Sequence, residues 1–238
     1  MPRTHLHSLP EGPSFAAIHH PAALPLAGVT LLAVEDSRFS SEALRLLCQR
    51  SGARMRRAET LAAARRHLAV YRPDVVLVDL GLPDGDGLDL IRELSRRGRG
   101  ESLVLAISGD PDRWSAAVRA GAAAFLEKPL DSLAAFQKII LGHLKGGGTG
   151  GFRIDDRPIH PDRQALRDDF VHAADLLAEG GDGEWRYALD FVTGLARSSN
   201  DPVLAGAAAD ARVSAAGVAG LGSLLAKRIS HCDDPFAA

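Results

Sequence analysis

Three short apolar runs restrict most strongly what this chain can fold into. They span residues 29–34 (VTLLAV), 75–78 (VVLV) and 103–107 (LVLAI). Continuous runs of this length and composition are typical of central strands whose two faces are both covered. Two weaker segments, 53–58 and 123–126, fit a polar edge strand and a short fifth strand.

Helical patterns separate these runs. Apolar residues recur at helical spacing within 37–49, 61–71, 88–94, 113–120 and 133–144. Thr60 is placed to cap the second of these helices and Asp131 the fifth. Five strand–helix units between residues 28 and 145 predict the α/β class, with a five-stranded, doubly wound parallel sheet.

The composition divides the chain. Residues 1–27 hold five of the 13 prolines, so we expect a flexible N-terminal arm. Residues 146–151 contain five glycines in six positions, which is typical of a flexible linker. The sequence therefore predicts one domain at 28–145 and a second at 152–238.

Charge and composition exclude several classes of protein. Apolar residues make up 46% of the chain and charged residues 24%, which excludes wholesale disorder. No apolar run approaches the roughly 18–20 residues that cross a bilayer, and the N-terminal segment lacks the apolar core of a signal peptide. Two cysteines form neither a disulfide framework nor a zinc pattern. We therefore expect a cytoplasmic protein that does not contact membranes.

The two parts of the chain differ in charge. From residue 152 onward there are nine Lys or Arg and 14 Asp or Glu residues, a net charge of −5, whereas the preceding part carries +3. An acidic second domain argues against binding to nucleic acid.

Polar residues follow four of the predicted strands at the point where each strand ends. Glu35 and Asp36 follow the first, Asp79 the third, Ser108 the fourth and Lys128 the fifth. Any one of them alone would be read as a helix cap, a turn or a surface residue. Because the carboxyl ends of parallel strands meet at one edge of a sheet, all five should converge.

The clustered carboxylates indicate a metal site. They repel one another unless a cation joins them, and oxygen ligands with open positions suit Mg²⁺. Glu35, Asp36 and Asp79 are the candidate ligands, directly or through water, and the backbone carbonyl of Gly81 is a further candidate.

The remaining groups indicate phosphoryl transfer. Lys128 carries a compact positive charge that can neutralise one phosphoryl oxygen, and Ser108 can donate a hydrogen bond to another. Asp79 is then the nucleophile, since a carboxylate can accept a phosphoryl group to form an aspartyl phosphate.

These motifs identify a family resemblance. The pair Glu35-Asp36, the loop 79–87 (DLGLPDGDG), Ser108-Gly109 and Lys128-Pro129 occur in the order and spacing of a response regulator receiver domain of bacterial two-component systems. The resemblance covers about residues 28–145. It implies a phosphoacceptor (Asp79), two Mg²⁺ ligands (Glu35 and Asp36), a switch hydroxyl (Ser108) and a phosphoryl-binding cation (Lys128).

The resemblance also implies partners and a switch. A sensor histidine kinase or histidine phosphotransfer protein would supply the phosphoryl group, and Phe125 occupies the position of an aromatic residue that changes rotamer on activation. Phe125 has no hydroxyl, and a simple core role is the alternative. Phosphorylation would remodel the face formed by the fourth helix, fifth strand and fifth helix.

The second domain is predicted to be an all-α bundle. Asp162, Asp182 and Asp201-Pro202 mark three helix starts, and a fourth helix is expected over about 218–229. The arrangement faintly resembles a histidine phosphotransfer domain, but segment 193–198 lacks the histidine of that family. His172, on the preceding helix, lacks the Lys-Gly that follows the family's histidine, and a helix-surface histidine is the plainer interpretation.

The leading hypothesis is a phosphorylation-controlled switch that acts through protein contacts, either a downstream target or a homodimer. A DNA-binding transcriptional regulator and a phosphorelay intermediate or phosphate sink remain alternatives. No Cys-His, Ser-His-Asp or metal constellation appears in the second domain. We therefore expect no enzymatic activity beyond self-catalysed phosphorylation and dephosphorylation at Asp79.

Overall fold

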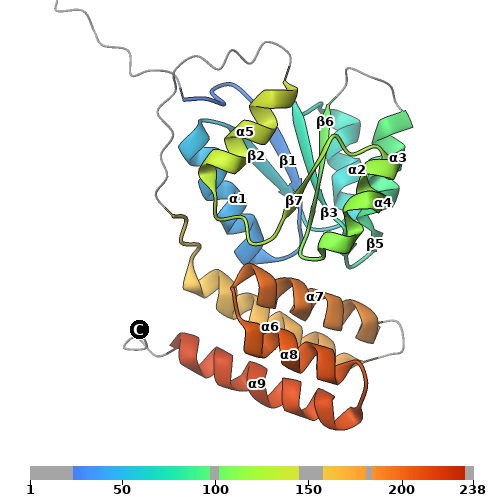
Figure 1. Ribbon diagram of the computed structural model, residues 1–238, viewed down its shortest axis with the longest axis vertical. Helices are drawn as coiled ribbons and strands as arrows, with labels where there is room; N and C mark the ends of the chain where they lie inside the picture. The colour runs from blue at the N-terminus through green and yellow to red at the C-terminus, as the bar shows by residue number, and fades with distance from the viewer. Residues whose placement is uncertain (1–23, 97–101, 145–157, 181–183, 234–238) are drawn as a thin grey trace, which may run out of the picture.

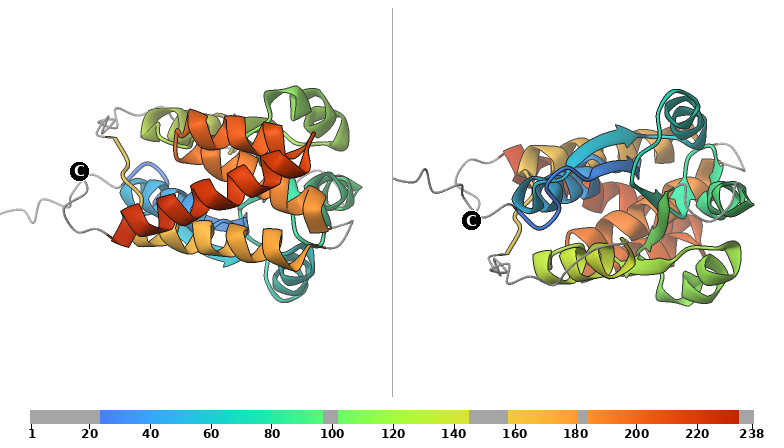
Figure 2. Two further views of the ribbon diagram at one scale, coloured as in Figure 1. Left: turned by 90° about the horizontal axis from the view of Figure 1, so that it is seen from below. Right: turned by 90° about the horizontal axis from the view of Figure 1, so that it is seen from above.

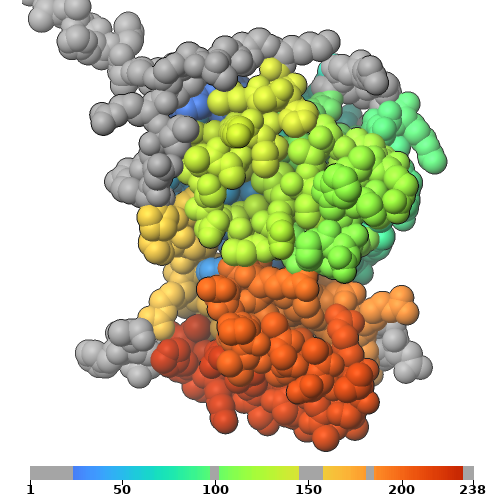
Figure 3. All heavy atoms as spheres, in the orientation of Figure 1, coloured from blue at the N-terminus to red at the C-terminus, as the bar shows by residue number. Residues whose placement is uncertain are grey.

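The computed structural model describes residues 24–96, 102–144, 158–180 and 184–233. An α/β domain lies above a helical bundle in Figure 1, and the two are in direct contact in the space-filling view (Figure 3). None of the helices in these residues is long and apolar enough to cross a membrane.

The α/β domain is built on a five-stranded parallel sheet with strand order β2-β1-β3-β6-β7. The strands are β1 (Thr30–Val34), β2 (Arg54–Ala58), β3 (Val75–Asp79), β6 (Leu103–Ser108) and β7 (Ala124–Glu127). All five residues of β3 are buried, whereas the first four residues of β2 alternate between exposed and partly buried positions, as in an edge strand. The predicted fold class is confirmed.

Helices cover both faces of the sheet. They are α1 (Arg38–Ser51), α2 (Leu61–Val70), α3 (Gly87–Arg96), α4 (Trp114–Ala120) and α5 (Leu133–His143). One core contains Leu44 and Leu47 of α1 together with Phe136 and Ile140 of α5. A second core, on the other face, contains residues of α2, α3 and α4.

Two local predictions were wrong. Leu26, expected in the flexible arm, is fully buried, and its N–H donates to the carbonyl of Ser51 (2.7 Å), so the ordered domain begins at least four residues before 28. The cap of α5 is Ser132 rather than Asp131, because the Ser132 side chain accepts from the N–H of Ala135 (3.2 Å). The rest of the predicted arm, 1–23, and the predicted linker, 146–151, lie outside the described residues.

A small hairpin was not predicted. Strands β4 (Gly81–Leu82) and β5 (Gly85–Asp86) pair antiparallel between β3 and α3. At Gly87, where α3 begins, a Cβ atom would lie 2.0 Å from the carbonyl oxygen of Asp79. Glycine at this position therefore lets the chain return close to the end of β3.

The bundle consists of α6 (Arg163–Glu179), α7 (Glu184–Ser198), α8 (Pro202–Ala211) and α9 (Ala215–Asp233). Asp162 and Asp201 cap α6 and α8 as predicted, with Pro202 at the first position of α8. The fourth helix is longer than predicted at both ends, and the predicted cap Asp182 lies outside the described residues. The bundle has its own apolar core and lies across the lower end of the α/β domain (Figure 2).

Candidate functional site

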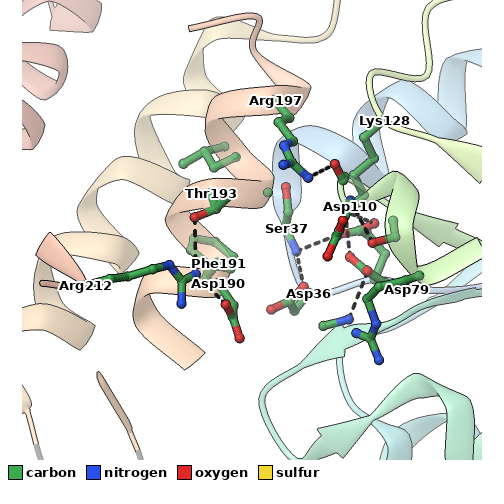
Figure 4. A pocket seen from close by; sticks show the side chains of 17 residues that line it. Asp36, Ser37, Asp79, Asp110, Lys128, Asp190, Phe191, Thr193, Arg197 and Arg212 are labelled. Carbon is green, nitrogen blue, oxygen red and sulfur yellow. Dashed lines mark hydrogen bonds and ion pairs between the residues drawn. The ribbon is translucent and has the colours of Figure 1, made fainter. Parts of the chain in front are cut away.

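The five side chains predicted to converge do so at the carboxyl edge of the sheet, on the side that faces the bundle (Figure 4). The ammonium group Nζ of Lys128 lies 2.6 Å from Asp79 Oδ2 and 2.8 Å from Glu35 Oε2. Glu35 is fully buried, and Asp79, Ser108 and Lys128 are each at most 7% exposed. The site is thus a group of charges withdrawn from solvent, and Lys128 bridges two of its three carboxylates.

Burial and mutual repulsion shift the ionisation of these groups. Burial raises the pKa of Glu35 well above its usual value, and it raises the pKa of Asp36 to about 6, with the charge on Asp79 adding to both shifts. Burial alone would lower the pKa of Lys128, but the carboxylates of Asp79 and Glu35 outweigh it and raise that pKa. Lys128 therefore stays protonated.

The carboxylate geometry fits a hard divalent cation. Glu35, Asp36 and Asp79 each offer one oxygen, and these oxygens all lie within 4.8 Å of one another. Gly81 lines the same cavity, and its N–H donates to Asp79 Oδ1 (3.1 Å). The structure thus brings every predicted ligand residue to one place, while ligation by the Gly81 carbonyl remains a prediction.

The loop after β6 is held by its own hydrogen bonds. Ser108 Oγ accepts from the N–H of Asp110 (3.0 Å). Arg113 donates to the carbonyl of Leu80 (3.0 Å) and pairs with Asp86 (2.6 Å). These bonds join the loop to the β4–β5 hairpin. The partly buried Phe125 packs against the core on the α2–α4 side, and its switch role remains a prediction.

The bundle contributes residues to the site that sequence reasoning missed. A cavity of about 370 Å³ lies between the strand ends and the bundle, and Thr193, Gly194 and Arg197 of α7 line its far wall. Tyr187 of α7 donates its hydroxyl hydrogen to Asp36 Oδ2, and Arg197 donates to the carbonyl of Gly109. Nothing near these residues in the sequence indicates that they meet the first domain.

An aspartate of α6 caps α1 across the domain boundary. Asp169 accepts hydrogen bonds from the N–H groups of Arg38 (2.9 Å) and Phe39 (3.0 Å) and from the hydroxyl of Ser37 (2.7 Å). Asp169 is only 2% exposed. Burial raises the pKa of its carboxyl group, and the three hydrogen bonds offset only part of this rise. A carboxylate at a helix N-terminus satisfies N–H groups that have no partner within the helix.

His172 does not line this cavity. It is exposed on α6, and its ring packs edge-on against Phe191 at a centroid distance of 5.2 Å. The plainer interpretation of a helix-surface histidine agrees with this placement.

Comparison with known proteins agrees with the geometry. Residues 31–140 match the response regulator receiver domain family. KDP operon transcriptional regulatory protein KdpE of Escherichia coli K12 is 37% identical over 99 residues, which cover 42% of this chain and 44% of KdpE. Transcriptional regulatory protein PhoP of the same strain is 35% identical over 102 residues, which cover 42% of this chain and 45% of PhoP. The chain thus matches less than half of each relative.

Solved structures with a similar fold include a putative response regulator from Chloroflexus aurantiacus, with 30% identity and a TM-score of 0.44, covering 48% of this chain and 98% of that one. Another is the receiver domain of sensor histidine kinase PA1611 from Pseudomonas aeruginosa, with 25% identity and a TM-score of 0.44, covering 49% of this chain and 97% of that one. The PA1611 receiver domain has a magnesium ion coordinated in its active site cleft. The family match and the convergence of the acidic residues with Lys128 identify residues 31–140 of this chain as a response regulator receiver domain of a two-component system.

Proposed function

We propose that this protein accepts a phosphoryl group on Asp79 from a histidine kinase or a histidine phosphotransfer protein. The observation that carries the proposal is the buried contact of Lys128 Nζ with Asp79 Oδ2 at 2.6 Å, inside a cluster of three carboxylates. A carboxylate oxygen of Asp79 would form a bond to phosphorus while the phosphorus–nitrogen bond of the donor breaks, and the donor imidazole keeps that electron pair.

The residues of the site have separate roles in this proposal. Glu35, Asp36 and Asp79 would hold Mg²⁺, which supplies charge neutralisation for phosphoryl oxygens when bound. Lys128 would move its ammonium group from bridging the carboxylates to a phosphoryl oxygen. Ser108 would donate its hydroxyl hydrogen to another phosphoryl oxygen, and the loop after it would move with it.

The helical bundle is the proposed output module, and it works through protein contacts. The acidity of residues 152–238, with a net charge of −5, supports this over binding to nucleic acid. The names of KdpE and PhoP suggest transcriptional regulation as the alternative, since both are called transcriptional regulatory proteins. No enzymatic activity of the bundle is part of the proposal.

The experiment is labelling with phosphoramidate in the presence of Mg²⁺, read by intact mass. The wild-type protein and an Asp110→Asn variant should each gain one phosphoryl group, because Asp110 lines the cavity but lies outside the carboxylate cluster. Asp79→Asn should gain none, and EDTA should prevent labelling of the wild type. Persistent labelling of Asp79→Asn would contradict the assignment of the phosphoacceptor.

A further inference from the structure

The docked bundle restricts access to Asp79. The cavity of about 370 Å³ that adjoins Asp79 is closed on its far side by α7 and by Arg212. A phosphoramidate-sized molecule fits such a space. A protein that presents a histidine on a helix does not, because a helix with its side chains is about 10–12 Å wide. The bundle and a protein phosphodonor therefore need the same face of the receiver domain.

The contacts that hold the bundle in this position concentrate on the start of α1. Asp169 accepts three hydrogen bonds there, as described above, and Phe39 of α1 packs against the core of the bundle. The hydroxyls of Ser40 and Ser198 lie 3.1 Å apart between α1 and α7. These contacts define a clasp, formed by Asp169, Phe39, Ser40 and Ser198, that is distinct from the phosphoacceptor cluster.

Bundle side chains also form hydrogen bonds with receiver groups that metal binding and phosphorylation would need. Asp36 Oδ1 accepts from the N–H of Ser37 (3.0 Å), and Oδ2 accepts from the hydroxyl of Tyr187. A metal ion that takes Oδ2 of Asp36 must displace this hydroxyl or share the oxygen with it. Arg197 holds the carbonyl of Gly109, directly after Ser108, and so fixes the loop that would follow the phosphoryl group.

We propose that the bundle is an intrachain cover of the phosphoacceptor site, which competes with Mg²⁺ and with a protein phosphodonor for the same face. This inference rests on the proposed function of Asp79. Because coupling between two binding events is reciprocal, a bundle that weakens Mg²⁺ binding is itself loosened when Mg²⁺ and a phosphoryl group bind. The receiver would thus signal by releasing its own bundle, whose covered surface becomes available to a protein target.

The first test opens the clasp in the full-length protein with Asp169→Asn. An amide has a single acceptor oxygen, and its NH₂ group cannot accept from the N–H of Phe39 or the hydroxyl of Ser37. We expect Mg²⁺ to bind about ten-fold more tightly by calorimetry, and phosphoramidate to label Asp79 about ten-fold faster. Asp210→Asn is the control, because Asp210 is exposed on α8, lies outside both the clasp and the lining of the cavity, and should behave as the wild type.

A second variant, Tyr187→Phe, keeps the ring and removes the hydroxyl. The proposal predicts tighter Mg²⁺ binding than in the wild type, since Oδ2 of Asp36 becomes available. Weaker binding would overturn it, because Tyr187 would then support the metal site rather than compete with it. A thermal melting curve of Asp169→Asn would reveal whether that variant folds. If it does not fold, Tyr187→Phe alone tests whether the bundle competes with Mg²⁺.

A disulfide provides the opposite perturbation. Ser40→Cys with Ser198→Cys, in a background carrying Cys232→Ser, should form a bond across the clasp when oxidised. Oxidation should slow phosphoramidate labelling several-fold, and reduction should restore it, while each single cysteine shows no redox effect. In the labelling reaction the phosphorus–nitrogen bond breaks, the new bond to Asp79 forms and nitrogen leaves as ammonia. If oxidation left the labelling rate unchanged, the proposal that the bundle covers Asp79 would be wrong.

The two proposals fail in different ways. If no variant is labelled at Asp79, the proposed function itself is wrong. If all variants are labelled at equal rates while Asp79→Asn remains unlabelled, the phosphoacceptor is correct and the cover is wrong.

Discussion

The substitution Asp36→Asn should make the protein more stable near neutral pH. The carboxylate of Asp36 is withdrawn from solvent beside Asp79, and this raises its pKa from 3.8 to about 6. A pKa that is higher in the folded state means that folding disfavours the ionised form. The free energy of unfolding should therefore fall as pH rises from about 4 to about 6, and it should stay at the lower level above that range.

The magnitude follows from the shift. About two pKa units at roughly 1.4 kcal/mol each give an upper limit of about 3 kcal/mol. Asp36 keeps some contact with solvent, and an Asn side chain offers Tyr187 a weaker acceptor, so the expected gain is about 1–2 kcal/mol. The gain should be present at pH 7.5 and should be largely lost near pH 4, where the wild-type carboxyl is protonated in the folded state and partly protonated in the unfolded state.

Urea unfolding followed by circular dichroism in EDTA measures this difference at both pH values. Asp190→Asn is the control, because the half-exposed Asp190 pairs with Arg212 at the surface and should change stability by less than about 0.5 kcal/mol. The reasoning would be refuted if Asp36→Asn were less stable than the wild type at pH 7.5. An equal gain at pH 4 and pH 7.5 would also refute it, since the effect would then not come from ionisation.

Three further predictions concern local packing. Gly87→Ala should reduce phosphoramidate labelling about ten-fold or more, because its Cβ would press on the Asp79 carbonyl, whereas Gly142→Ala, with open space around it, should not. Asp201→Ala should lower the free energy of unfolding by about 1–3 kcal/mol in urea, because it removes both the cap of α8 and the pair with Arg228. Burial raises the pKa of Cys48 to about 12, so Cys48 should resist iodoacetamide at pH 8 in the folded protein and react once unfolded; equal rates would contradict this.

The receiver site could be predicted from the sequence because parallel strands place their carboxyl ends at one edge. Once the apolar runs were assigned as strands, the residues that follow them had to meet, and the structure brings Asp79, Lys128 and Glu35 within hydrogen-bonding distance. The error at the start of α5 has a local cause. Ser132 and Asp131 are both good caps, and only backbone geometry chooses between them.

The contribution of the bundle could not be predicted from sequence patterns. Tyr187 meets Asp36 across 151 positions, and Asp169 meets Ser37 across 132. In the sequence, Asp169 is one of two adjacent acids in an amphipathic helix, which is an ordinary solvent-facing pattern. Only the docking of the bundle against the α/β domain turns it into a buried cap on α1.

Hydrogen exchange with beryllofluoride, a mimic of the aspartyl phosphate, tests most directly the claim that Asp79 and the bundle share one face. The informative peptide contains the N–H groups of Arg38 and Phe39, which donate to Asp169 in the docked state. The account predicts that Mg²⁺ with beryllofluoride speeds exchange of this peptide in the wild type and leaves Asp79→Asn unchanged. Exchange that stays the same or slows in the wild type, with beryllofluoride shown to bind, would contradict it.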